Sequence, residues 1–183
     1  MIPSHCLAVL SRHRDEVWLV KFSPSGLKIA SIGKDCVLYL WSISKAPGLS
    51  KANQYKIKCS HEIRGHAKQV NALNWSHDES ELVVTASADK TVKIWDSKTG
   101  RLVLDIHDRH QEAIVSAIFI PGTSGIRLLT AAVDKLVIIW ELTTVPGTTR
   151  DGYPLYQAEE IARIETRNYL DASASLTRLV LMG

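Results

Sequence analysis

Three stretches of this 183-residue chain repeat one another, and the repeat limits the possible folds more than any other feature. The stretches span His13–Ile43, His66–Ser97 and His110–Leu142, and each begins with a histidine. In every copy an aspartate follows that histidine by 22 to 24 residues, and a tryptophan follows the aspartate by six. A period of roughly 20 to 50 residues is typical of folds that stack copies of one supersecondary unit.

Each copy divides into short runs rich in β-branched and aromatic residues. The second copy has four such runs, at residues 69–75, 82–87, 91–96 and 101–106, separated by turn-forming residues. This pattern predicts four strands joined by three tight turns, which is one antiparallel sheet. Residues 158–166 are compatible with either a helical turn or the fourth strand of the third copy. No long apolar pattern with a helical period competes with the strands.

The recurring His, Ser/Thr, Asp and Trp, with the dipeptides Gly65-His66 and Trp95-Asp96, resemble the WD-repeat family of β-propellers. The resemblance implies that these four residues form a hydrogen-bonded set inside each blade, because buried polar groups need partners. The first and third copies depart from the family pattern, since they lack both the glycine and the Trp-Asp dipeptide. By position the three structural sets are His13, Ser31, Asp35, Trp41; His66, Thr85, Asp89, Trp95; and His110, Thr130, Asp134, Trp140.

The predicted fold class is all-β, a partial WD-repeat propeller of about three and a half four-stranded blades in an incomplete ring. The tryptophans are 54 and 45 residues apart, so the first copy needs an insertion. The predicted segments are 1–12, the outer strand of a preceding blade; 13–65, the first blade with an inserted loop at 44–55; 66–109, the second; 110–164, the third with an inserted loop at 143–153; and 165–183, the start of a truncated fourth.

An incomplete ring exposes unpaired strand edges. We therefore expect a fragment, a truncated gene product or a chain that a partner completes. On its own such a chain is expected to be poorly soluble or to self-associate.

The composition is that of a soluble globular protein, with 45% hydrophobic and 22% charged residues. The net charge of +3 is spread along the chain, so no nucleic-acid partner is expected. Cys6, Cys36 and Cys59 are far apart in sequence, which favours a reducing compartment over a disulfide framework. With no apolar run that could cross a bilayer, we expect no membrane partner and a cytoplasmic and/or nuclear location.

Motifs for catalysis and for cofactors are not found. Gly33-Lys34 is followed by Asp35 and not by Ser or Thr, so it is no phosphate-binding loop. His107 and His110 are close, but no third ligand lies at zinc-site spacing. The sequence therefore predicts no catalytic residues, no metal, no cofactor and no small-molecule substrate.

Some stretches of the sequence resemble one group of WD-repeat proteins in particular. His13 to Trp18, reading HRDEVW, is similar to the first propeller blade of the WD-repeat subunit of the GID/CTLH E3 ubiquitin ligase, as are Val133-Asp134-Lys135 and the order of motifs from Asp151 to Val180. That resemblance implies a non-enzymatic subunit that assembles the ligase or recruits substrates. The family's helical LisH, CTLH and CRA segments are absent from this sequence. The alternative is a generic WD-repeat scaffold in signalling, RNA processing or chromatin.

Two residues are candidate partner contacts. Trp18 aligns with Asn71 and Val115 in the other copies, so we expect it to be about half exposed, and an exposed tryptophan is typical of binding hot spots. Packing against a neighbouring blade or the 44–55 insertion is the alternative. Lys34 precedes the turn aspartate, on the side where WD-repeat proteins often bind partners, and the alternative there is a surface lysine with no role.

Overall fold

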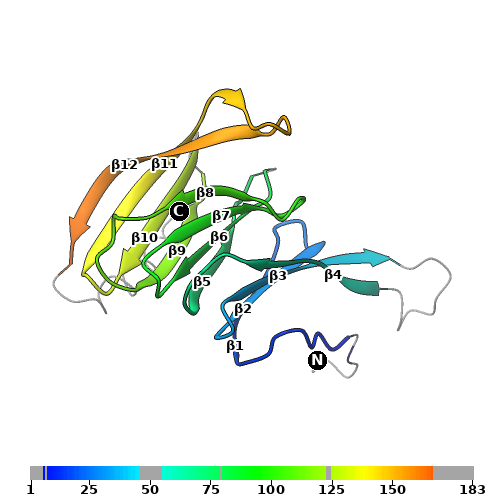
Figure 1. Cartoon of the computed structure of the whole chain (residues 1–183). Coiled ribbons are helices and arrows are strands. Elements are labelled where there is room, and N and C mark those ends of the chain that lie inside the picture. Colours follow the sequence, from blue (N-terminus) through cyan, green and yellow to red (C-terminus); the bar gives the residue numbers. More distant parts are fainter. Residues whose placement is uncertain (1–5, 7, 46–54, 79, 123–124, 167–183) are drawn as a thin grey trace.

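The computed structural model describes residue 6 and residues 8–45, 55–78, 80–122 and 125–166. These residues form three four-stranded antiparallel sheets (Figure 1). The strands are β1 (Val17–Phe22), β2 (Lys28–Gly33), β3 (Val37–Lys45), β4 (Tyr55–Arg64), β5 (Val70–Trp75), β6 (Leu82–Ser87), β7 (Val92–Asp96), β8 (Leu102–Ile106), β9 (Ile114–Ile120), β10 (Ile126–Ala132), β11 (Leu136–Thr148) and β12 (Pro154–Glu165).

Each sheet is a blade in which the strands are neighbours in chain order. Blade 1 is β1–β4, blade 2 is β5–β8 and blade 3 is β9–β12. The first strands of successive blades, β1, β5 and β9, contact one another, and they are the inner strands of the blades. The three sheets do not close a ring, which confirms the predicted fold class, an all-β partial propeller. Residues 158–166 belong mainly to β12 and not to a helical turn. The described residues include no helix that is long and apolar enough to cross a membrane.

Successive blades pack face to face. The face of a blade that meets the preceding blade is called its near face, and the opposite one its far face. Ile32 and Leu40 on the far face of blade 1 share one buried cluster with Leu73, Trp75 and Trp95 on the near face of blade 2. A second buried cluster joins blades 2 and 3 in the same way, through Val84, Ile94, Phe119 and Trp140 among others. Burial of these apolar faces is the main term that holds the blades together.

Hydrogen bonds between the inner strands fix the packing. Trp75 Nε1 donates to the carbonyl oxygen of Lys21 in blade 1 at 3.2 Å. Asn71 Nδ2 donates to the carbonyl oxygen of Ile114 in blade 3 at 2.8 Å. Both bonds cross a blade boundary, so they set the position of one blade relative to the next.

Blade 1 has an uncovered near face at its inner strand. Val20 and Phe22 of β1 are 53% and 62% exposed, whereas their counterparts in blade 2, Leu73 and Trp75, are each 3% exposed. The residues at these positions are apolar in both blades. Their exposed fractions differ because blade 1 has no described blade before it. An apolar face of this kind is the physical basis for the expected self-association.

The segment 143–153, predicted as an inserted loop, is strand up to Thr148 and a turn only after it. β11 continues through Thr148 and pairs with β12 from Val145↔Leu155 to Thr148↔Pro154, so the segment is a hairpin that extends blade 3. The β-branched residues before Pro146 favour a strand, and Pro146 and Gly147 fit where the register shifts between Val145 and Thr148. The predicted insertion at 44–55 similarly has paired ends, Lys45↔Tyr55, while residues 46–54 lie outside the described residues.

The predicted outer strand at residues 1–12 is not formed in its described part. Cys6 and residues 8–12 lie in no strand, because none of the three sheets offers them a neighbouring strand to satisfy their backbone hydrogen bonds. Leu10 instead packs against the cluster that contains Ile29 and Trp41. The predicted start of a fourth blade, 165–183, lies outside the described residues beyond Thr166.

Candidate protein-binding surface

The four repeated residues of blade 2 are linked by hydrogen bonds. His66 Nδ1 is 3.0 Å from Asp89 Oδ2, and His66 Nε2 is 2.8 Å from Thr85 Oγ1. Trp95 Nε1 donates to the same Thr85 oxygen at 2.8 Å. With the carboxylate accepting from Nδ1–H, the bare Nε2 accepts the threonine proton, and the threonine oxygen is free to accept the indole proton. The imidazole, the hydroxyl and the indole N–H thus all have partners.

The other two blades repeat this geometry. In blade 1 the His13 Nδ1–Asp35, His13 Nε2–Ser31 and Trp41 Nε1–Ser31 distances are 3.0, 2.9 and 3.1 Å. In blade 3 the corresponding distances, all within the set of His110, Thr130, Asp134 and Trp140, are 3.0, 2.9 and 3.0 Å. In each blade the structure therefore brings together the four residues of the set derived from the sequence, twelve residues in all.

The aspartate of each set also holds two loops in place. Asp89 accepts the backbone N–H of Ala67, next to the histidine, at 2.8 Å, and that of Thr91 in its own turn at 3.0 Å. The residue after the aspartate has a left-handed backbone in every blade, with φ of 62° at Cys36, 71° at Lys90 and 68° at Lys135. Since side chains rarely adopt this conformation, the aspartate bonds hold a strained turn closed.

Gly65, before the histidine of blade 2, is explained by close packing. A Cβ atom at this position would lie 2.5 Å from the end of the Trp95 indole ring. The Gly-His dipeptide noted in the sequence therefore reflects contact with the tryptophan of the same blade.

Burial and hydrogen bonding shift the acidity of the sets. Burial alone would raise the pKa of Asp89, but hydrogen bonds from His66, Thr91 and the Ala67 N–H outweigh it and hold that pKa far below its ordinary value. The pKa of Asp35 is lowered in the same way, against its burial, by the Arg14 N–H and by His13. Burial lowers the pKa of His110, although Asp134 opposes the change.

The sets are buried within the blades. Thr85 and Thr130 are fully buried and His110 nearly so, and the same arrangement occurs three times. His110 is fully engaged by Asp134 and Thr130. The described residues hold no group of three His, Cys, Asp or Glu side chains suited to a metal ion.

The two candidate contact residues lie together. Trp18 Nε1 donates to Glu16 Oε2 at 3.1 Å, and Lys34 Nζ lies 3.5 Å from Glu16 Oε1 and 3.8 Å from Asp15 Oδ1. We call these four exposed residues, Asp15, Glu16, Trp18 and Lys34, the Trp18 patch. The two acids were not predicted as contacts, although their position just before Trp18 is a local signal.

A bulge in β1 aims Trp18 outward. The pairing of β1 with β2 shifts register between Val17 and Leu19, and Trp18 is the extra residue. Blade 2 has the same shift around Asn71, which uses its side chain to bond the next blade. Trp18 makes no hydrogen bond to another described blade, and its side chain is 38% exposed. The patch lies at the end of blade 1 that carries the Asp35 turn.

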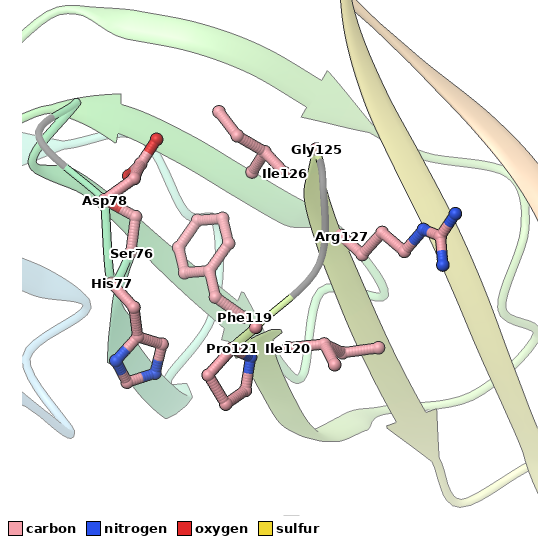
Figure 2. A pocket seen from close by; sticks show the side chains of 10 residues that line it. Ser76, His77, Asp78, Phe119, Ile120, Pro121, Gly125, Ile126 and Arg127 are labelled. Atoms are coloured by element: carbon pink, nitrogen blue, oxygen red, sulfur yellow. The ribbon is translucent and has the colours of Figure 1, made fainter. Parts of the chain in front are cut away.

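A separate hollow of about 390 Å³ opens between blades 2 and 3 (Figure 2). It lies at the opposite end of the blades, between the turn that follows β5 and the turn that follows β9, with Phe119 between His77 and Ile126. Arg127 on its rim donates to Glu141 at 3.1 Å. It is a recess between two blades, distant from the Trp18 patch along the strands.

Comparison with known proteins identifies the repeat. The family model "WD domain, G-beta repeat" (WD40) matches residues 4–42 and 57–96, which cover most of blades 1 and 2. The chain carries WD repeats. Blade 3 is tied to the matched blades by the same hydrogen-bonded set.

WD-repeat relatives are found among proteins of several kinds. The chain is 32% identical over 169 residues to "WD repeat-containing protein 26 homolog" of Arabidopsis thaliana, covering 92% of this chain and 27% of that protein. It is 32% identical over 147 residues to one of the subunits of chromatin assembly factor 1 from Mus musculus, covering 73% of this chain and 24% of that one. The chain thus spans about a quarter of the length of these curated relatives.

Among solved structures, "Structure of U3-55K" matches with a TM-score of 0.64 at 18% identity, over 88% of this chain and 43% of the other. At this identity the likeness shows the fold alone. It agrees with the WD-repeat arrangement of the three blades.

Replacing Thr85 with valine should destabilise the protein by about 1–3 kcal/mol, because the buried His66 Nε2 and Trp95 Nε1 lose their shared partner while the volume is kept. Urea unfolding measures the change. Thr143→Val, at an exposed threonine on β11, is the matched control and should change stability by less than about 0.5 kcal/mol. An unchanged unfolding midpoint for Thr85→Val would contradict the assigned role.

Acid should unfold the protein. The pKa values of Asp35 and Asp89 are lower in the folded state, so the stability they contribute is present above the ordinary carboxyl value of about 4 and lost as pH falls below it. The pKa of His110 is also lowered by folding, so its protonation below about pH 6.5 favours the unfolded chain. Urea midpoints measured from pH 7 down to pH 3 should fall, and less steeply in Asp89→Asn. A midpoint independent of pH would refute this account.

Proposed function

We propose that this WD-repeat chain is a non-enzymatic platform that binds other proteins, with the Trp18 patch as a contact surface. The observation that carries the proposal is the exposed Trp18 on the β1 bulge, where blade 2 uses Asn71 for internal bonding. Large, amphipathic tryptophan side chains contribute much of the energy at protein interfaces.

The charges around Trp18 suit a protein partner. Glu16 accepts the indole N–H, and Lys34 pairs with both Glu16 and Asp15, so ion-paired groups lie beside the tryptophan. An apolar centre with a polar rim is the usual anatomy of a protein interface. Because these groups carry both signs of charge, they support orientation of a partner more than long-range attraction.

The finer proposal is that the assembly is a GID/CTLH-type E3 ubiquitin ligase, in which the chain recruits substrates for ubiquitin transfer or assembles the complex. It is supported by the resemblance of residues 13–18 and of the later blade motifs to the WD-repeat subunit of that ligase. A nuclear or cytoplasmic location is part of this proposal.

A second candidate is a WD-repeat subunit of a chromatin or RNA-processing assembly. The chain is 32% identical to the chromatin assembly factor 1 protein of Mus musculus over 147 residues, and 32% identical to the Arabidopsis thaliana relative over 169 residues. A relative named "U5 small nuclear ribonucleoprotein 40 kDa protein" in Dictyostelium discoideum is 30% identical over 104 residues. These names support a role in large assemblies without selecting one.

The experiment measures binding of the full chain to purified GID/CTLH ligase core and, in parallel, to chromatin assembly factor 1. The proposal expects binding to the ligase core, weakened about tenfold or more by Trp18→Ala, since one hot-spot residue contributes at least about 1.4 kcal/mol. Tyr55→Ala, at an aromatic residue of similar exposure on β4, is the control and should bind as the unchanged chain does. Full affinity in a folded Trp18→Ala variant would rule out the Trp18 patch as a contact surface. Binding only to chromatin assembly factor 1 would rule out the ligase in favour of the second candidate.

A further inference from the structure

A groove runs along the outermost strand of blade 2. Its first wall is β8, and its second is the β11–β12 hairpin, which extends past the other strands (Figure 1). Two hollows, of about 150 and 530 Å³, lie along it and share Leu155 and Tyr156 as lining residues. From Arg101 to His107 the whole length of β8 lines one hollow or the other. The groove is therefore continuous along that strand.

The hairpin is anchored at one end of the groove. Arg101, just before β8, pairs with Asp151 at 2.5 Å and lies over the Tyr153 ring at 4.9 Å. The hairpin turn itself is closed by the Gly152 N–H, which donates to the Thr149 carbonyl oxygen at 2.9 Å. These contacts hold the second wall in position against blade 2, so the groove is preformed.

The groove walls expose apolar side chains to solvent. Leu102 on β8 is 46% exposed, and Tyr153 and Leu155 on the hairpin are each 38% exposed. Trp140, Val145 and Ala158 line the larger hollow beside Leu155. Exposed apolar residues gathered in a concave surface mark a binding site more than a solvated face.

The edge of β8 offers hydrogen bonds. β8 is the last strand of its sheet, so its backbone groups on the side away from β7 pair with no other strand of the described chain. An open strand edge beside an apolar groove suits an extended peptide, which adds to the sheet through its main chain and places alternate side chains in pockets.

The charge at the anchored end is negative. Arg101 is neutralised by Asp151, whereas Asp96 lines the same hollow. The pKa of Tyr156 is raised, first by burial and then by the negative charges of Asp78 and Asp96. At the other end, in the larger hollow, Asp105 is paired with Lys93, and His107 and Arg109 also line the hollow. A cationic side chain is therefore complementary to the anchored end and not to the open one.

We propose that the groove between β8 and the β11–β12 hairpin binds an extended segment of a partner protein that carries an apolar residue and, a few positions along, a lysine or arginine. The apolar residue occupies the larger hollow beside Leu155, and the basic residue lies near Asp96. The proposal rests on the protein-binding role proposed above, but it uses a different surface, so Trp18→Ala should leave binding in the groove unchanged.

The test selects short random peptides displayed on phage against the full chain and measures the affinity of the enriched peptides by fluorescence anisotropy. The expected peptides share an apolar residue followed or preceded by a basic one. Leu155→Glu should weaken them about tenfold or more, as expected for an anchor residue. Ile161→Glu, at a residue of β12 that is 46% exposed and lines neither hollow, is the matched control.

A second variant isolates the charge. Asp96→Asn keeps the oxygen that accepts the N–H groups of Lys98 and Thr99, so the turn is retained and only the charge is lost. It should weaken basic peptides and reduce the dependence of their affinity on salt. The proposal is overturned if no shared motif is enriched, if the enriched peptides are acidic, if Leu155→Glu and Ile161→Glu act alike, or if Asp96→Asn leaves affinity and salt dependence unchanged.

Discussion

The hydrogen bond from a buried tryptophan to a buried threonine or serine is the interaction on which each blade depends. In blade 2 the Thr85 oxygen links Trp95 on β7 to His66, which in turn links to Asp89. These bonds span an inner loop, a middle strand and a turn, so they fix elements that are more than twenty residues apart in sequence. In this dry environment each bond is strong, and each unpaired atom would be costly. The apolar faces that pack blade against blade are held in shape by this internal order.

Much of the fold could be predicted from the sequence, because the residue types of the repeat are compatible with only one good hydrogen-bonded arrangement. The twelve residues of the sets follow from their spacing and the resemblance to WD repeats, and the four strands of blade 2 from their β-branched runs. The hairpin at 143–153 could not be predicted, because Pro146 and Gly147 have the local chemistry of a loop and only the pairing with residues 154–157 makes them part of a strand. The predicted strand near the N-terminus failed for the opposite reason: Ala8 to Leu10 has strand chemistry but no neighbouring strand. The roles of Asp15 and Glu16 also depend on folding, which brings Lys34 to them.

The surfaces proposed for binding arise where blade 1 and blade 3 differ from blade 2. Trp18 occupies a bulge position at which Asn71 bonds to the next blade, and the extension of β11 and β12 builds a wall that the shorter β7 and β8 lack. Both features are carried by the regular scaffold and leave its hydrogen-bonded sets untouched. In such a fold, the residues that differ from one blade to the next therefore indicate where function resides.

Hydrogen exchange of the five tryptophan indole N–H groups tests the central claim most directly. The account predicts slow exchange for Trp41, Trp95 and Trp140, whose indoles donate to buried Ser31, Thr85 and Thr130, and fast exchange for Trp18, whose partner Glu16 is exposed. Nitrogen-15 NMR of the full chain in D₂O resolves these signals one by one. An indole of Trp95 that exchanges as fast as that of Trp18 would contradict the account.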